Sequence, residues 1–205
     1  MEKAPMDKLP VARIECDEAK ELADLVSLSQ DLTFVVDATE RLAKLMRDNS
    51  EDQVLIRSLW SAALVAYVRC FTSGKRFGMN KDIFSAAEGG EVTHQYFKDT
   101  RDKHIAHSVN PFEEVQIGLV LSEQADKPVL GVAKLSVFRL TDDLHNIEQL
   151  GRLAGYARQI IERQGKEIEE KVLAQGRILS KAKIEELPRI RIQPSGGTAT
   201  ARSPR

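Results

Sequence analysis

The chain has 205 residues, of which 42% are hydrophobic and 30% are charged, and its formal net charge is −1. This length suits one sizeable domain with a real core. The near-neutral balance excludes a global field that would draw the whole protein to nucleic acid or to a membrane, but it leaves room for a local basic site. The two cysteines, Cys16 and Cys70, are far apart, which predicts free thiols in a reducing compartment.

No segment of the sequence has the features of a secretory signal or a membrane span. The first residues, MEKAPMDKLPVARIEC, lack an apolar h-region. The longest uncharged apolar stretch, LWSAALVAYV, is well short of the roughly 20 residues that a spanning helix needs. We therefore expect a cytoplasmic protein that does not associate with membranes.

Helical periodicity begins after a short N-terminal arm. Two prolines predict that residues 1–16 are extended. From Asp17 to Met46, apolar residues recur at steps of three and four. This pattern predicts one long helix, or two helices broken near Ser29–Thr33.

A second and a third helix are predicted before the hydrophobic pattern changes from a helical period to the alternation of a strand. Ser50 can cap a helix over about residues 51–73, which is apolar around much of its circumference and should be the most buried. A short helical segment is predicted within 80–90. A further helix should run from about 91 to 107, where Asn110-Pro111 ends it.

The second half of the chain combines a hairpin with a long helix. Residues 114–121 and 130–140 alternate apolar and polar side chains, which predicts a β-hairpin over about 114–138. A long final helix should start at about residue 142 and continue, with weaker periodicity, to 187. The remaining residues, 188–205, form a basic segment rich in Pro, Gly and Ser that we predict to be disordered. The domain predicted over 17–187 is thus a mainly α helical bundle with an inserted β-hairpin.

The helix predicted to end near residue 107 carries a charged residue on its packing face. One face consists of His94, Phe97, Arg101, His104, Ile105 and Ser108. The opposite face consists of Gln95, Asp99, Asp102, Lys103 and Ala106, and it is an ordinary solvent face. Arg101 lies between two apolar residues of the packing face, where a buried charge is costly unless it has a partner.

An arginine near histidines suits phosphodiester chemistry. A guanidinium binds phosphate oxygens in a bidentate manner and stabilises charge that develops on them. Histidine can transfer a proton near neutral pH. In RNA the 2′-hydroxyl already supplies the nucleophile, so no metal is required. The alternative is structural: Arg101 would pair with a carboxylate of a neighbouring helix, and the histidines would lie at the edge of the core.

The run RDKHIAHS, at residues 101–108, resembles the R-x(4–6)-H signature of the HEPN superfamily, and most closely its AbiU-type, abortive-infection-related branch. Five residues separate Arg101 from His107, within the range of that family, and a polar residue follows the arginine as Asp102. The resemblance covers roughly residues 18–175 and implies a HEPN-like antiparallel helical bundle.

The resemblance also implies an activity, metal-independent RNA cleavage at a cleft that two motifs share across a homodimer, in phage defence or a toxin system. Arg101 would hold the scissile phosphate, His107 would act in proton transfer or phosphate contact, and Asp102 would orient one of them. An antitoxin is a further implied partner. Val109 stands where members modified by a nucleotidyltransferase partner have tyrosine, which argues against that form of regulation.

Auxiliary contacts and other functions stay open. His104 and Ser108 could add binding contacts from the same helix face. Lys75 and Arg76 flank a glycine-containing loop and are either solvated charges or contacts to an RNA backbone. No cofactor is predicted, and a metal site of His94, His104 and His107 is disfavoured because no carboxylate or thiolate lies at ligand spacing.

Two functional alternatives to cleavage remain. The first is a non-catalytic module that binds a nucleotide or RNA in the same groove. The second is a purely structural dimerisation protein in which Arg101 is paired with a carboxylate of its own chain.

Overall fold

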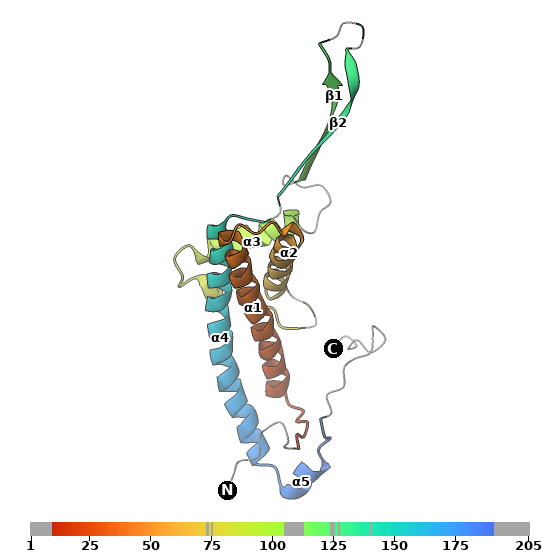
Figure 1. The fold of residues 1–205 in the computed structure, drawn as a ribbon. Helices are drawn as coiled ribbons and strands as arrows, with labels where there is room; N and C mark the ends of the chain where they lie inside the picture. The colour runs from red at the N-terminus through yellow and green to blue at the C-terminus, as the bar shows by residue number, and fades with distance from the viewer. Residues whose placement is uncertain are drawn as a thin grey trace. The chain divides into compact units, whose positions relative to one another are not determined.

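The computed structural model describes residues 10–72, 74, 76–104, 113–123, 126, 128–139 and 141–190, without the side chains of His104, Glu113 and Phe138. The described chain is mainly helical and contains one two-stranded antiparallel sheet (Figure 1). The prediction of a mainly α protein with an inserted hairpin is therefore confirmed. Two compact units can be distinguished: unit 1 comprises Met1–Ser29, Ser73–Phe77 and Ile160–Arg205, and unit 2 comprises Gln30–Thr72 and Gly78–Gln159.

The first helix, α1, is continuous over Asp17–Arg47, so there is no break near Ser29–Thr33. Acidic residues in its first turn and basic residues in its last turn match the helix dipole. The chain leaves the helix through Asn49, whose φ of 50° is left-handed, a conformation that asparagine tolerates better than most residues. The amide of Ser50 then donates to the carbonyl of Leu45 at 2.9 Å, which closes the last turn.

Helix α2 spans Gln53–Arg69 and is shorter than the predicted range of 51–73. Its N-cap is Asp52, whose carboxylate accepts a hydrogen bond from the amide of Leu55 at 2.9 Å. The prediction that Ser50 caps this helix is wrong, because Asp52 lies closer to the first turn and Ser50 accepts only from the amide of Asp52, at 3.3 Å. The helix is strongly buried, as predicted, through Ile56, Trp60, Ala63, Leu64, Ala66, Tyr67 and Val68.

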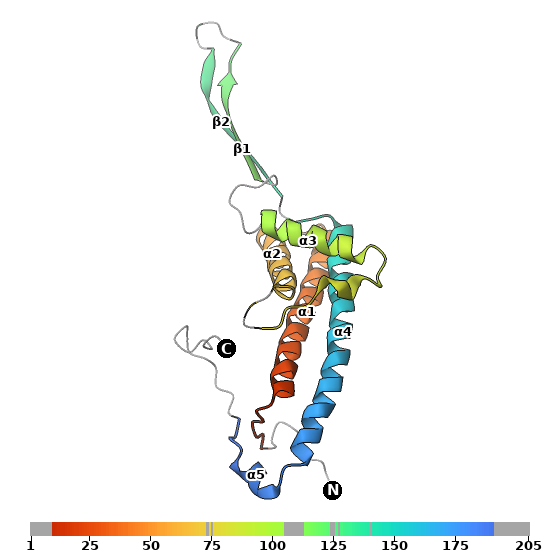
Figure 2. The same ribbon diagram turned by 180° about the vertical axis from the view of Figure 1, so that it is seen from behind.

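Helix α3 spans Gly90–His104 and packs on α2 (Figure 2). The short helical segment predicted before it is a 3-10 helix, η2, over Lys81–Phe84. Phe97 of α3 meets Trp60 of α2 edge to face, with ring centroids 6.3 Å apart. The last residues of the predicted helix, 105–107, lie outside the described part.

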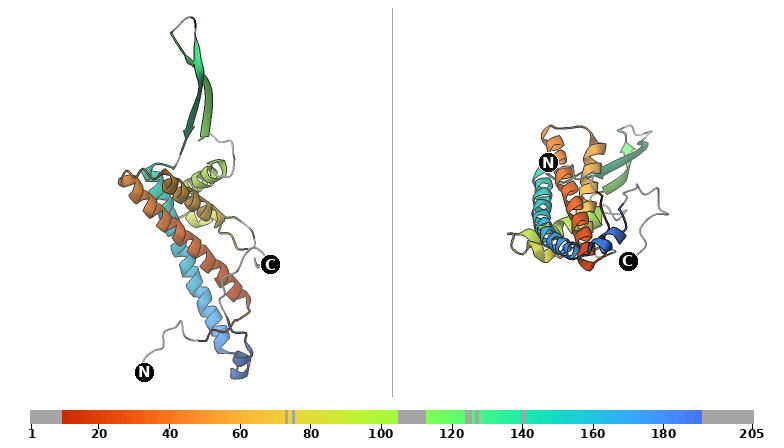
Figure 3. Two further views of the ribbon diagram at one scale, coloured as in Figure 1. Left: turned by 45° about the vertical axis from the view of Figure 1, so that its right-hand side comes forward. Right: turned by 90° about the horizontal axis from the view of Figure 1, so that it is seen from below.

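The two strands form the predicted hairpin. β1 spans Glu113–Leu121 and pairs antiparallel with β2, Val129–Phe138, with one bulge between Val120 and Leu121. Every described side chain on these strands is at least partly exposed, so neither strand packs against a helix (Figure 3). Neither face of the hairpin is buried within the described part of the chain.

Helix α4 spans Leu144–Arg177 and begins at the predicted place. Asp143 accepts a hydrogen bond from the amide of Asn146 at 2.8 Å, as an N-cap residue does. The helix ends ten residues before the predicted limit of 187. The chain turns and begins a separate short helix, α5, at Lys181–Glu186, where Ser180 accepts from the third amide of that helix at 3.3 Å.

Unit 1 joins the N-terminal part of α1 to the C-terminal part of α4 (Figure 1). The hydroxyl of Ser29 donates to Glu162 at 3.3 Å. In the N-terminal arm, which was predicted to be extended, Ala12 forms an isolated antiparallel β-bridge with Arg189. The basic tail predicted to be disordered lies outside the described residues from position 191 onward.

In unit 2 the C-terminal part of α1 runs antiparallel to the N-terminal part of α4. Arg47 forms an ion pair with Glu148 at one end of this contact. Further along, an added Cβ at Gly151 would lie 2.6 Å from the Oγ1 of Thr39. The Thr39 hydroxyl is buried and donates to backbone carbonyls of its own helix, so it has little freedom to move away. The absence of a side chain at position 151 therefore allows the close approach of the two helices.

Replacing Gly151 with Ala is expected to lower the free energy of unfolding by about 1–2 kcal/mol, because overpacking outweighs the gain in helix propensity. Urea denaturation followed by circular dichroism measures this change. Gly155→Ala is the matched control, since its Cβ would make only an ordinary contact of 3.9 Å, and it should stabilise the protein by about 0.5–1 kcal/mol. Adding Thr39→Ala to Gly151→Ala should recover most of the loss. Equal stability of the two single variants would contradict the close helix contact.

Candidate functional site

Arg101 lies in the last turn of α3, and its charge is partly buried. One third of its side chain is exposed, and its Nη1 donates to the carboxylate of Asp102 at 2.7 Å. Its Nε is shielded from solvent and has no hydrogen-bond partner among the described groups. Burying a polar nitrogen without a partner costs free energy, so a guanidinium in this state favours an additional acceptor.

The predicted division of α3 into two faces is confirmed for its most buried and most exposed side chains, while Asp99 and Asp102 of the predicted solvent face are half-buried. His94 and Phe97 are buried, whereas Lys103 on the opposite face is largely exposed. Lys103 forms an i,i+4 ion pair with Asp99 at 3.8 Å, as expected for a solvent face. Arg101 therefore belongs to the packing face, but near its edge.

The carboxylate nearest to Arg101 comes from the adjacent position of the same helix. The structural alternative expected a carboxylate of a neighbouring helix, and no such contact is present among the described residues. The Arg101–Asp102 contact does agree with pairing inside the chain. It also places the Asp102 carboxylate against Nη1 of the guanidinium.

Several predicted site residues are not brought together by the described structure. His107, Ser108 and Lys75 lie outside the described residues, and His104 is described only as the end of the α3 backbone. Arg76 belongs to unit 1, and its Nη1 donates to the hydroxyl of Ser27 at 2.8 Å. Its auxiliary role stays a prediction.

His94 is part of the core and has an aromatic environment. A hydrogen bond of 2.9 Å joins its Nδ1 to the hydroxyl of Tyr67, and the rings of Phe71 and Phe84 lie beside it. Burial lowers the pKa of His94, the positive charges of Lys98 and Lys81 lower it further, and Glu91 opposes them. His94 is thus a buried core residue whose Nδ1 is engaged by Tyr67, which argues against a part in a metal site or in proton transfer.

The lowered pKa of His94 predicts that stability declines in mild acid. In the unfolded chain a histidine has a pKa near 6.5. Below that pH, His94 therefore binds a proton in the unfolded state more readily than in the folded state. The free energy of unfolding should be fully retained above about pH 6.5 and should fall below it by up to about 1.4 kcal/mol per pH unit. Urea denaturation at a series of pH values measures the slope. His94→Phe should flatten the part of the pH dependence that is attributable to this residue.

A cluster around Asp142, which the sequence did not reveal, fixes the junction between the hairpin and α4. The Asp142 carboxylate is buried and accepts hydrogen bonds from the Tyr96 hydroxyl of α3 and, at 3.1 Å, from Asn146 of α4. Arg139, just after β2, lies 3.7 Å from the same carboxylate. Burial and then the bond to Asp142 raise the pKa of Tyr96. Both carboxylate oxygens of Asp142 have partners, so the cluster holds α3 against the start of α4 and does not resemble a catalytic acid.

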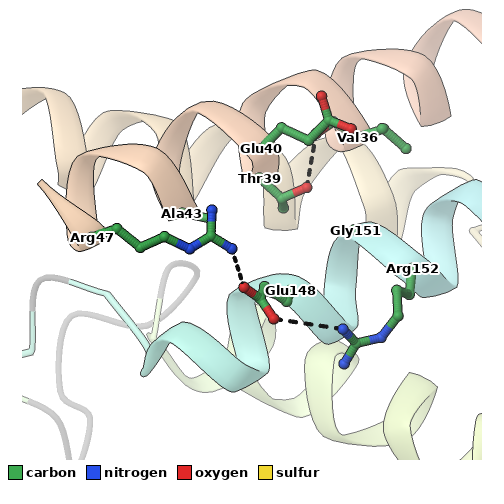
Figure 4. Close-up of a pocket in the computed structure, with 8 residues that line it drawn as sticks. All are labelled: Val36, Thr39, Glu40, Ala43, Arg47, Glu148, Gly151 and Arg152. Atoms are coloured by element: carbon green, nitrogen blue, oxygen red, sulfur yellow. Dashed lines mark hydrogen bonds and ion pairs between the residues drawn. The ribbon is translucent and has the colours of Figure 1, made fainter.

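A pocket of about 380 Å³ lies between α1 and α4 within unit 2 (Figure 4). It is lined by Val36, Thr39, Glu40, Ala43, Arg47, Glu148, Gly151 and Arg152. Both arginines contact Glu148: Arg47 pairs with it across the two helices, and Arg152 pairs with it at 3.6 Å within α4. None of the predicted site residues lines the pocket, and we assign it no function.

The described residues contain no group of three or more His, Cys, Asp or Glu that could hold a metal ion. Over the same part of the chain, no helix is long and apolar enough to cross a membrane. Comparison of the sequence with protein-family models and with curated proteins, and of the fold with solved structures, found no match.

Proposed function

We propose that this protein is a metal-independent endoribonuclease of HEPN type, with Arg101 as the phosphate-binding residue and His107 as the proton-transfer residue. The observation that supports it is the state of Arg101: partly buried on the packing face of α3, paired through Nη1 with Asp102, and with an Nε that has no partner among the described residues. The second support is the resemblance of RDKHIAHS to the motif of that family.

The proposed chemistry uses the nucleophile that RNA carries itself. The 2′-hydroxyl attacks the adjacent phosphorus, and the bond to the 5′-oxygen of the next nucleotide breaks. Arg101 stabilises the negative charge that builds up on the phosphate oxygens, since a guanidinium matches two of them at once. His107 removes the proton of the 2′-hydroxyl or protonates the leaving oxygen. The products are a 2′,3′-cyclic phosphate and a 5′-hydroxyl.

Asp102 has a positioning role in this proposal. Its carboxylate holds Nη1 of the guanidinium at 2.7 Å, so the group is already partly fixed in place. A fixed guanidinium loses less conformational freedom when it binds than a free one does. The family branch further suggests phage defence or a toxin system, acting as a homodimer and controlled by an antitoxin.

The test is cleavage of a mixed set of fluorescent RNAs by the full chain in the presence of EDTA. The wild-type protein should cut at least one RNA, and the 5′ fragment should carry a 2′,3′-cyclic phosphate. A 2′-deoxy nucleotide at the cut position should block cleavage while binding persists, because only the nucleophile has been removed. His107→Ala should also bind without cutting. Cleavage that survives the 2′-deoxy substitution would exclude the proposed nucleophile.

The second candidate is a non-catalytic module that binds RNA or a nucleotide. It is favoured by the pairing of Arg101 with Asp102, because that contact satisfies part of the charge without any substrate. Fluorescence anisotropy separates the two functions. Binding that depends on Arg101, with intact RNA after prolonged incubation, would replace the nuclease by the binding module.

A further inference from the structure

The β-hairpin of unit 2 exposes an unusual amount of apolar surface. Ten large aliphatic side chains on its two strands are between 43% and 72% exposed. A two-stranded hairpin without further packing is marginally stable in water. These strands therefore need a cover that the described residues do not supply.

The strand register assigns nine of these ten side chains to two faces, and Leu130 lies at the bulge without a directly paired residue. Directly paired residues share a face, as Leu119 does with Val132. The first, which we name the aliphatic face, comprises Val115, Ile117, Leu119, Leu121, Val129 and Val132. Lys134 is the one charged residue among the described side chains of this face, and it lies opposite Ile117. The other face carries Val120, Leu135 and Val137, together with Glu114, Gln116 and three small residues.

The area of the aliphatic face matches what a dimer contact requires. Six aliphatic side chains of roughly 80 Å² each amount to on the order of 500 Å², the size of the largest apolar patches on ordinary monomers, which are often functional. Two such faces together would bury roughly 1,000 Å², the lower limit for a specific interface. Lys134 does not prevent this contact, because its aliphatic stem can lie along an apolar surface while the ammonium reaches the rim.

The charges and backbone groups of the hairpin distinguish between a lipid bilayer and a second protein chain as the partner that buries the aliphatic face. Glu123 and Asp126 place carboxylates at its tip, which opposes insertion of the tip into a bilayer. The outer edges of the two strands carry backbone N–H and C=O groups without a partner strand, and lipid chains cannot form hydrogen bonds with them. The partner that buries the aliphatic face must be available whenever the chain folds. A second copy of the same chain meets this requirement. A face that packs on itself gives a closed two-fold contact.

We propose that the aliphatic face of the hairpin packs against the same face of a second copy of this chain, making the hairpin a dimerisation arm. This inference does not rest on the proposed ribonuclease function, since it uses only exposure and strand register, and self-association can be measured without RNA. It differs from the dimer implied by the RDKHIAHS motif, because it assigns the contact to residues outside that motif.

Sedimentation velocity on the full chain over about 1–100 µM tests the proposal. Wild type should be a dimer. The triple variant Ile117→Thr, Leu119→Thr, Val132→Thr should raise the dissociation constant at least about tenfold, because threonine keeps strand propensity but removes apolar area. The matched control is Val120→Thr, Leu135→Thr, Val137→Thr on the other face, which should dimerise like wild type.

Cysteine cross-linking provides a measurement that does not depend on a destabilised hairpin. In a Cys16→Ser background, Leu119→Cys should form a disulfide-linked dimer under mild oxidation, whereas Glu114→Cys on the other face should not; Cys70 is buried. A monomeric wild type, or loss of dimer in the control triple only, would overturn the proposal. A monomer that co-sediments with phosphatidylcholine vesicles would replace the second copy by lipid.

Discussion

Replacing Arg101 with Ala is expected to reduce RNA cleavage at least about 100-fold, which corresponds to roughly 2.7 kcal/mol of lost transition-state stabilisation. The expected loss is large because the guanidinium is the group proposed to meet charge that develops on the phosphate, and it is already held by Asp102 at 2.7 Å. Initial cleavage rates at saturating and at low RNA concentration measure the effect. The loss should fall mainly on kcat, since contacts made only in the transition state do not govern ground-state binding.

The control set for Arg101 separates charge from geometry. Arg101→Lys keeps the charge but loses the planar fork, so it should restore only a small part of the activity. Asp102→Asn removes the charge partner of Arg101 and should have a smaller effect than Arg101→Ala. Lys103→Ala removes a cation from the exposed face of the same helix and should leave the rate nearly unchanged. If Lys103→Ala and Arg101→Ala were equally damaging, a diffuse electrostatic contribution would account for the data.

Within the candidate site, the sequence predicted the features that depend on the periodicity of one helix, α3. The period of α3 correctly separated the buried Phe97 from the exposed Lys103, and it put Arg101 on the packing side. It did not predict that the partner of Arg101 is its own neighbour, because an arginine can select among several carboxylates and the outcome depends on side-chain rotamers. Nor did it indicate that His94 forms a buried hydrogen bond with Tyr67, which depends on a contact between two helices.

In the fold as well, sequence periodicity did not predict features that depend on contacts between elements. Periodicity located the helices and strands well, but their ends depend on local competition, as when Asp52 rather than Ser50 caps α2. Contacts distant in sequence were not accessible, including the bond between Tyr96 and Asp142 and the close approach of Gly151 to Thr39. Strand alternation predicted the hairpin. It carries no information on whether the cover lies in the same chain, and here no described residue provides it.

The aromatic cluster that positions α3 should be the most sensitive part of the core. Phe97 is fully buried and meets the rings of Trp60 at 6.3 Å, Tyr67 at 6.3 Å and Tyr96 at 5.3 Å. Phe97→Ala should lower the free energy of unfolding by about 3–5 kcal/mol, because it removes a large apolar side chain and leaves a cavity that a rigid cluster cannot close. Urea denaturation measures the change, which would be a large fraction of the stability of an ordinary domain.

Val92 provides the matched control for Phe97, because it is an apolar residue of the same helix that is 77% exposed. Val92→Ala should change stability by no more than about 0.5 kcal/mol. A loss below about 1 kcal/mol for Phe97→Ala would contradict the packing of α3 on α2. Phe97→Leu, a milder change, should leave the protein folded but shift the helix that carries Arg101. If the proposed site depends on the placement of that helix, Phe97→Leu lowers kcat at a temperature where the protein is fully folded, and Val92→Ala does not.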